Sequence, residues 1–276
     1  MRQLLIIDPQ NDFCDIAGAA LPVAGASADL HRLAGFVDAV PLHGITVTLD
    51  SHASVAVERT TFWTDALGNA PAPFTWVTSR DVLAGTFVPR DSRLTPAVLA
   101  MLKQLEAKGR DGLVIWPVHC VTGTWGHNIH DTLSVALAGW EFKQQRAVRK
   151  VLKGEYPLTE HFGVFEADAS DATVASTQFN TALAHAVTDG VEVLFLAGEA
   201  GSHCVAASFD QLAAYLDRQT RRPRVVLLTD CMSPVPGFED QQTALLERAR
   251  AWGAETMTSA QAASVFSEHA PQSHTA

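Results

Sequence analysis

The stretch at residues 191–216 constrains the fold more than any other, because it combines a strand, a tight turn and a helix. It begins with a short apolar run at 191–196, rich in strand-forming residues, as expected for a buried strand of a parallel sheet. Small residues dominate the next few positions, and a helical pattern of apolar residues then starts at Cys204. We therefore expect a strand–turn–helix unit with Cys204 in the first turn of the helix.

This position suits a cysteine that acts as a nucleophile. The first turn of a helix offers free backbone N–H groups and the positive end of the helix dipole, and both stabilise a thiolate. Open α/β sheets also place their functional sites at the carboxyl ends of their strands. A small buried thiol is the alternative interpretation, since cysteine is among the most frequently buried residues. The segment as a whole favours the nucleophile.

Similar apolar runs recur along the chain and alternate with helical patterns. The predicted helices cover 28–40, 95–108, 174–187 and 241–252, and the predicted strands, besides the one at 191–196, fall within 4–7, 45–49, 142–152, 225–228 and 255–257. This alternation predicts an α/β fold of three layers, with a six-stranded parallel sheet in a single domain over residues 1–276. The segment at about 63–112 is the least regular, and we expect a long insert there.

The composition excludes several classes of partner. The 276 residues carry 30 acidic side chains against 20 lysines and arginines, a formal net charge of -10, which argues against nucleic acid or an anionic membrane as partners. No apolar run is long enough to span a membrane, and the chain starts directly with a strand rather than a signal peptide. The four cysteines form no Cys-x-x-Cys pair. We expect a cytoplasmic protein with reduced thiols that acts on a small molecule, and a homo-oligomer is left open.

Polar residues stand at the ends of three of the predicted strand segments. Asp8 follows the first strand, Lys153 ends another, and Cys204 comes after the turn described above. Because the carboxyl ends of parallel strands meet at one edge, these three side chains are expected to converge. Such a group suits acyl transfer, with Asp8 accepting the thiol proton and Lys153 holding Asp8 ionised. Backbone N–H groups around Ala200 and Cys204 would form an oxyanion hole. Asp8 as a plain turn residue is the alternative.

An Asp-x-His pair, Asp50 and His52, follows another predicted strand. Alternate residues of a strand project to the same side, so this pair suits a divalent ion held by a carboxylate oxygen and an imidazole nitrogen. His119 is the natural further ligand, and Glu58 is close enough in sequence to loop back as another. The alternatives are a hydrogen-bonded Asp–His pair and a buried structural histidine.

Three other histidines are also candidate site residues. His203 adjoins Cys204 and is a tempting base, but a neighbour on the same turn usually points elsewhere, so we prefer Asp8. We interpret His127 and His130 as structural.

Six short motifs occur in a fixed order over nearly the whole chain. They are IIDPQNDFC (6–14), ALPVAGA (20–26), DSH (50–52), WPVHCVTGT (116–124), KGEY (153–156) and GEAGSHCVAAS (198–208). This set resembles the isochorismatase-like cysteine hydrolase family, and within it the nicotinamidase (pyrazinamidase) branch. The resemblance implies a catalytic triad and one divalent metal ion, zinc first, with iron or manganese as alternatives. It places the triad at Asp8, Lys153 and Cys204, and the metal at Asp50, His52 and His119.

The resemblance also concerns the substrate pocket. It implies a non-proline cis peptide at Glu199–Ala200, and aromatic walls from Phe13 and Trp116 around a pyridine ring, with His203 also at the pocket. The sequence departs from the family at Glu58, where histidine is usual, in the loss of an acid before the cysteine, and in the length of the insert.

The leading interpretation is a metal-dependent amidohydrolase that converts nicotinamide to nicotinate and ammonia through a thioester at Cys204. The same triad acting on another small amide, a carbamoyl compound or a hydrazide is the alternative. A metal-free isochorismatase is disfavoured, because the metal residues and Cys204 would not be needed together. A dinucleotide-binding module is disfavoured because G-x-G-x-x-G is missing after Ile7. A non-catalytic relative would be expected to have lost a member of the triad, and all three are present.

Overall fold

The computed structural model describes residues 1–267 and centres on one parallel sheet. Its six strands lie in the order β10-β9-β8-β1-β2-β7, and every neighbouring pair is parallel. The strands are β1 (Arg2–Ile7), β2 (Gly44–Asp50), β7 (Arg149–Lys153), β8 (Val193–Gly198), β9 (Arg224–Leu228) and β10 (Glu255–Met257). The predicted six-stranded parallel sheet of an α/β fold is confirmed.

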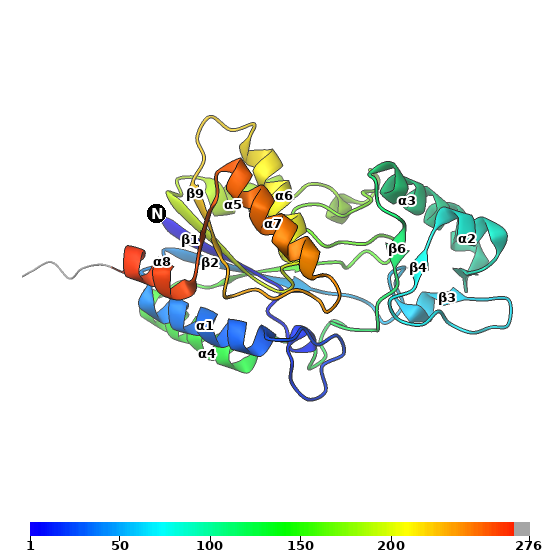
Figure 1. Cartoon of the computed structure of the whole chain (residues 1–276), viewed down its shortest axis with the longest axis horizontal. Helices are drawn as coiled ribbons and strands as arrows, with labels where there is room; N and C mark the ends of the chain where they lie inside the picture. The colour runs from blue at the N-terminus through cyan, green and yellow to red at the C-terminus, as the bar shows by residue number, and fades with distance from the viewer. Residues whose placement is uncertain (268–276) are drawn as a thin grey trace, which may run out of the picture.

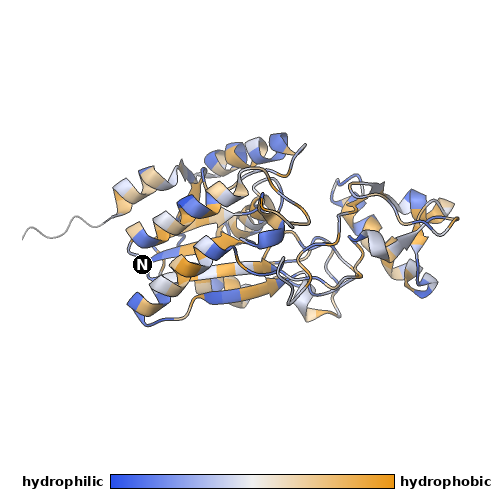
Figure 2. Ribbon diagram, turned by 90° about the horizontal axis from the view of Figure 1, so that it is seen from below, coloured by the Kyte–Doolittle hydropathy of each residue, from blue (hydrophilic) through white to orange (hydrophobic). Residues whose placement is uncertain are grey.

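Helices cover both faces of this sheet (Figure 1). One layer holds α1 (Ala26–Ala39), α4 (Asp131–Gln144) and α8 (Ser259–Phe266), and the other holds α5 (Thr181–Thr188), α6 (Cys204–Leu216) and α7 (Glu239–Trp252). Successive side chains of a strand point to opposite faces, so β1 sends Leu4 and Ile6 into one core and Leu5 and Ile7 into the other. Burial on both faces explains why the central strands β1, β8 and β9 are mostly apolar, and Figure 2 shows hydrophobic (orange) segments in the sheet. The edge strands β7 and β10 are less buried.

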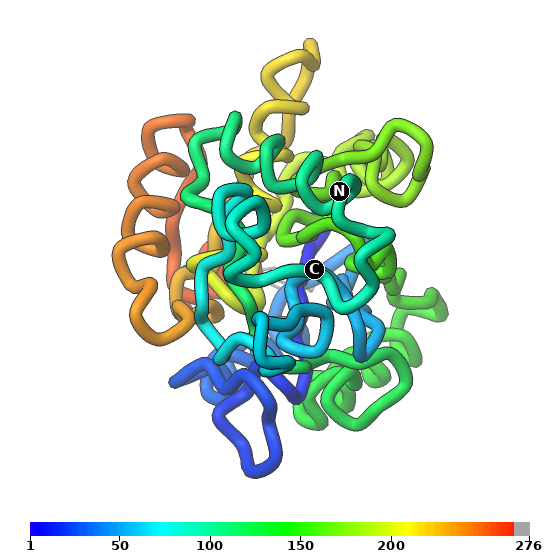
Figure 3. The backbone as a smooth tube through the Cα atoms, turned by 90° about the vertical axis from the view of Figure 1, so that its right-hand side faces the viewer, coloured from blue at the N-terminus to red at the C-terminus, as the bar shows by residue number. Residues whose placement is uncertain are grey.

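The insert, residues 63–112, lies beyond the carboxyl ends of the sheet strands (Figure 1) and faces the viewer in Figure 3. It contains β3 (Trp63–Thr64), β4 (Trp76–Val77), α2 (Ser79–Ala84), β5 (Val88–Pro89) and α3 (Thr95–Ala107). β3 pairs with β5, and β4 pairs with β6 (Leu113–Val114), both antiparallel. Trp63, Val98 and Leu105 belong to a hydrophobic cluster centred on this segment, so the insert has a core of its own.

Several predicted elements need correction. The apolar run at 113–115 contains β6, which joins β4 of the insert and not the main sheet. The strand region predicted at 142–152 starts only at Arg149, because residues up to Gln144 belong to α4. This helix was missed because exposed apolar residues, Val135 and Phe142, obscure its buried face.

The helix predicted at 174–187 begins only at Thr181. Asn180 caps it, since its side chain accepts a hydrogen bond from the Leu183 N–H at 2.9 Å. Helices α2 and α8 were not predicted. Short 3₁₀ turns complete the chain at η1 (Asn11–Phe13), η2 (Thr60–Phe62), η3 (Ser92–Leu94) and η4 (Ala175–Thr177).

Two further observations concern the whole described chain. Between residues 1 and 267, no helix combines the length and the apolar character that crossing a membrane requires. All four cysteines are free and buried.

Candidate active site

The end of β1, the end of β7 and the start of α6 bring Asp8, Lys153 and Cys204 together at the carboxyl edge of the sheet. The Lys153 Nζ lies 2.9 Å from Asp8 Oδ2 and 3.6 Å from Cys204 Sγ. All three side chains are buried. Asp8 is held further by Thr48, whose hydroxyl accepts from the Asp8 N–H at 3.0 Å and donates to its carboxylate. The ammonium group therefore lies between a carboxylate and a thiol.

The electrostatics of this group differ from the sequence-based expectation of a stabilised thiolate. Burial raises the pKa of the Cys204 thiol well above its ordinary value, and the charge of Lys153 opposes this only in part. Burial also raises the pKa of Asp8, against the lowering effect of Lys153. The free protein thus holds a thiol next to an unusually basic carboxylate, and the proton has to move between them before sulfur can attack.

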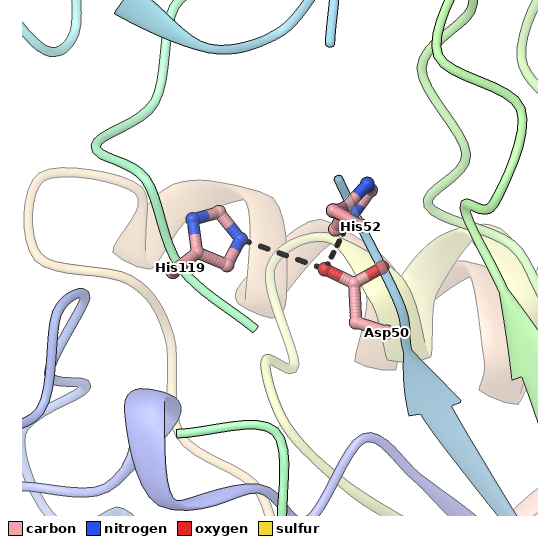
Figure 4. Close-up of side chains that lie close together, drawn as sticks. All are labelled: Asp50, His52 and His119. Carbon is pink, nitrogen blue, oxygen red and sulfur yellow. Dashed lines mark ion pairs between the residues drawn. The ribbon is translucent and has the colours of Figure 1, made fainter. Parts of the chain in front are cut away.

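Asp50 connects the triad to a second group of side chains, which it forms with His52 and His119. Its Oδ1 lies 2.7 Å from Lys153 Nζ, whereas Oδ2 lies 2.7 Å from His52 Nε2 and 3.5 Å from His119 Nε2 (Figure 4). Burial opposes ionisation of Asp50, but the charges of His52 and Lys153 outweigh it and hold the pKa well below the usual range. Gln10 fixes the Asp50 backbone, accepting from its N–H at 2.7 Å and donating to its carbonyl at 2.8 Å.

The second group fits a divalent metal ion. Asp50, His52 and His119 offer one oxygen and two nitrogens that all lie within 4.8 Å of one another. The other ring nitrogen of each histidine has its own neighbour: His119 Nδ1 is 2.8 Å from the Pro117 carbonyl, and His52 Nδ1 is 2.9 Å from Glu58 Oε1. Such partners orient an imidazole for metal binding. Glu58 therefore lies behind His52 and outside the group of three.

A pocket opens between the triad and the metal group. Its lining includes Cys204 of the triad and Asp50, His52 and His119 of the metal group. Its aromatic lining includes Phe13, whose ring centroid is 5.2 Å from that of His119, and Trp116, whose centroid is 5.3 Å from that of His203. Phe162 completes this wall, with its centroid 5.1 Å from His203.

His203 belongs to the aromatic wall. Burial lowers its pKa to about 4, and the charge of Arg110 acts in the same direction. Its Nδ1 lies 2.8 Å from the Ser202 hydroxyl. A neutral ring held by a neighbouring serine is a poor competitor to Asp8 as a base.

The turn before α6 presents backbone N–H groups to the same pocket. The peptide Glu199–Ala200 is cis. Within residues 1–267, neither the Ala200 N–H nor the Cys204 N–H donates a hydrogen bond. Both are thus free to donate to a developing oxyanion. The Glu199 side chain instead accepts from the Ser233 N–H at 3.2 Å and is not part of the pocket lining.

Two of the histidines lie outside the site. His127 Nε2 is 2.8 Å from the Ser51 hydroxyl, and the His130 ring packs edge-on against His31 with centroids 5.5 Å apart. Neither residue lines the pocket, in keeping with a structural role.

Three charged residues that no sequence motif marked lie in the pocket wall or directly behind it. Arg59 and Glu160 are buried in its wall. Arg110, from the insert, is 3.6 Å from the Glu160 carboxylate, and its guanidinium lies over Phe162 at 5.0 Å. No pattern in the sequence marked them, because charged residues in irregular segments are normally exposed.

Comparison with known proteins finds solved structures with a similar architecture. No family model and no curated protein matches the sequence. Among solved structures, yeast nicotinamidase is 20% identical, with 93% of this chain and 99% of that chain covered and a TM-score of 0.63.

Two further structures are similar over nearly their whole length. The pyrazinamidase of Pyrococcus horikoshii, solved in complex with zinc, is 16% identical, with 93% and 98% covered and a TM-score of 0.50. An isochorismatase-like hydrolase from Alkaliphilus metalliredigens is 14% identical, with 96% and 98% covered and a TM-score of 0.52. The chain therefore has the fold that the nicotinamidases share with the isochorismatase-like hydrolases.

Proposed function

We propose that the protein is a cysteine amidohydrolase of the isochorismatase-like family that hydrolyses a small aromatic carboxamide, with nicotinamide as the substrate and nicotinate and ammonia as the products. The observation that carries the proposal is the buried Lys153 ammonium, which contacts both Asp8 and Cys204 at the wall of a small aromatic pocket. A carboxylate, an ammonium and a thiol arranged in this way serve nucleophilic acyl transfer.

The first half of the reaction forms a thioester. Cys204 Sγ attacks the amide carbon while its proton passes to Asp8, whose raised pKa makes it a competent acceptor. The N–H groups of Ala200 and Cys204 stabilise the oxyanion. Asp8 then returns the proton to the amide nitrogen, the C–N bond breaks, and ammonia leaves. The acyl group remains on sulfur.

The second half uses the same residues on water. Asp8 accepts a proton from the water as its oxygen attacks the thioester carbon, and the C–S bond breaks to release the carboxylic acid. The proton then returns to Cys204. Lys153 stays charged throughout, because burial lowers its pKa but the carboxylates of Asp50 and Asp8 raise it well above the ordinary value.

We propose that Asp50, His52 and His119 hold one divalent ion, zinc first, with Glu58 supporting His52 from behind. The zinc in the complex of the pyrazinamidase relative and the closeness of the three ligand atoms support this. A bound ion would supply a Lewis acid that anchors the ring nitrogen of the substrate. The four free, buried cysteines fit a reducing compartment, and we place the enzyme in the cytoplasm.

Ammonia release from nicotinamide, pyrazinamide and benzamide tests the proposal. Nicotinamide should be hydrolysed, and benzamide, which lacks the ring nitrogen, much more slowly. Cys204→Ala should abolish turnover, while Cys231→Ala, a buried cysteine away from the pocket, should keep it. Metal analysis should find about one divalent ion per chain if one site of this ligand type forms.

Two outcomes would count against specific parts of this proposal. Full turnover in Cys204→Ala refutes the nucleophile. If both pyridine-type amides fail while another amide, a carbamoyl compound or a hydrazide is cleaved through Cys204, the hydrolase stands and the nicotinamide assignment falls.

A further inference from the structure

One buried cation at the pocket has no role in the reaction described above. Arg59 is fully buried and lines the pocket beside His119. Its Nη1 donates to the Pro117 carbonyl at 3.1 Å, and its Nε lies 3.3 Å from Glu58 Oε1. Within residues 1–267, its Nη2 has no hydrogen-bond partner. A buried donor without an acceptor is costly, so this group is suited to meet an acceptor on a ligand.

With a divalent ion at the metal group, the charges around the pocket would also favour an anion. The groups buried there are three carboxylates, those of Asp8, Asp50 and Glu58, and two cations, Lys153 and Arg59. With His52 and His119 neutral, as metal binding requires, their sum is -1, and a divalent ion at the metal group would make it +1. The Glu160 carboxyl does not cancel this positive charge, because burial raises its pKa to about 8. The neighbouring cation, Arg110, is paired with Asp168 at 2.7 Å.

Arg59 stands at the end of the pocket away from the reacting sulfur. One oxygen of Asp50 contacts Lys153, which in turn contacts Cys204, whereas the other oxygen faces His52 and His119. Arg59 adjoins His119 and Glu58 on this second side. A substrate whose carbonyl lies at Cys204 therefore extends its far end toward Arg59.

We propose that Arg59 determines specificity by binding a carboxylate at the far end of the substrate. The inference rests on the proposed amide hydrolysis and extends its substrate class to flat aromatic carboxamides that carry a carboxylate. The planar guanidinium of arginine matches a carboxylate better than lysine does, and the aromatic lining accepts a flat ring.

Three amides on one scaffold provide the test in the wild-type enzyme. Benzamide has no second polar group, nicotinamide has a ring nitrogen meta to the amide carbon, and 3-carbamoylbenzoate has a carboxylate at the meta position. The carboxylate should raise kcat/KM about 10- to 100-fold over benzamide, the range expected for a hydrogen bond to a charged group. Equal values for these two amides overturn the inference even if nicotinamide is hydrolysed well. This comparison needs no variant of Arg59.

Binding to a variant that cannot turn over supplies a readout besides activity. In Cys204→Ala, calorimetry should show that Arg59→Met weakens 3-carbamoylbenzoate binding about 10- to 100-fold and leaves benzamide binding unchanged. Arg59→Lys should restore part of the affinity, because it keeps the charge without the planar fork. A purely structural Arg59 would weaken both ligands alike, and that result refutes the inference. If no amide is hydrolysed but Arg59 selects the carboxylate, the proposed function fails and the binding role stands.

Discussion

Replacing Glu160 with glutamine should stabilise the protein, and the gain should grow with pH. Burial raises the pKa of this carboxyl from 4.5 to about 8, against the lowering effect of Arg110. Its Oε1 accepts from the Trp116 indole N–H at 3.1 Å, a bond that the glutamine carbonyl can keep. The substitution therefore removes the titrating group at little cost in packing.

The direction and the magnitude of this change in stability follow from proton linkage. Between pH 4.5 and 8 the unfolded chain releases the Glu160 proton while the native protein keeps it, so the wild type loses stability as the pH rises through this window. The full window corresponds to about 5 kcal/mol at most, at about 1.4 kcal/mol per pKa unit. We expect the difference between Glu160→Gln and wild type to grow by about 3–4 kcal/mol from pH 5 to pH 9.

Urea unfolding at pH 5, 7 and 9 measures this difference, with the thermal midpoint as a second probe at about 2–4 °C per kcal/mol. Glu247→Gln, on the exposed surface of α7, is the matched control and should follow the wild-type pH profile. If Glu160→Gln also runs parallel to wild type across this range, the carboxyl is ionised in the native protein and the reasoning is wrong.

Three further predictions concern the triad and the metal group. Lys153→Met should lower the free energy of unfolding by about 3–5 kcal/mol, because it removes the ammonium that contacts the buried Asp8 and Asp50. Adding Asp8→Asn should recover part of this loss. Urea unfolding that shows no recovery would contradict the energetic coupling between Lys153 and Asp8. Asp8→Asn alone should reduce kcat at least about 100-fold, since the amide cannot accept the thiol proton, and single-turnover kinetics that show normal acylation would disprove this role. Glu58→Gln should weaken zinc binding about 10- to 100-fold without abolishing it, whereas His52→Ala should abolish zinc binding. Competition with a chromogenic chelator measures the zinc affinity of both variants. Equal losses of affinity would make Glu58 a ligand.

The sheet and the meeting of the triad could be predicted from short stretches of sequence. The strands β1, β2, β8 and β9 are recognisable as largely apolar runs because they are buried on both faces, and Asp8 and Asp50 stand where two of these runs end. Lys153 ends the edge strand β7, which is charged and mostly exposed. Parallel strands bring their carboxyl ends to one edge whatever their order in the sheet. The convergence of these residues therefore required no knowledge of the loops.

The helices were less predictable where local pattern and tertiary contact disagree. α4 buries Leu133, Leu137 and Trp140 but leaves Val135 and Phe142 exposed. Its apolar residues therefore do not follow the helical period in the sequence. β6 has the composition of a sheet strand, yet its partner is β4 of the insert. Which strand pairs with which depends on contacts between distant segments, and no local pattern records them.

The sequence by itself determined the fold class and the set of candidate reacting and metal-binding residues, because residue type and position at strand ends settle both. Only the tertiary structure decided how these residues are charged and what surrounds them. The Cys204 thiol is held protonated rather than as a thiolate, and Arg59 and Glu160 are buried in the pocket wall. Burial is the physical reason, since it arises from chain segments packing together and changes the free energy of every ionisable group they enclose.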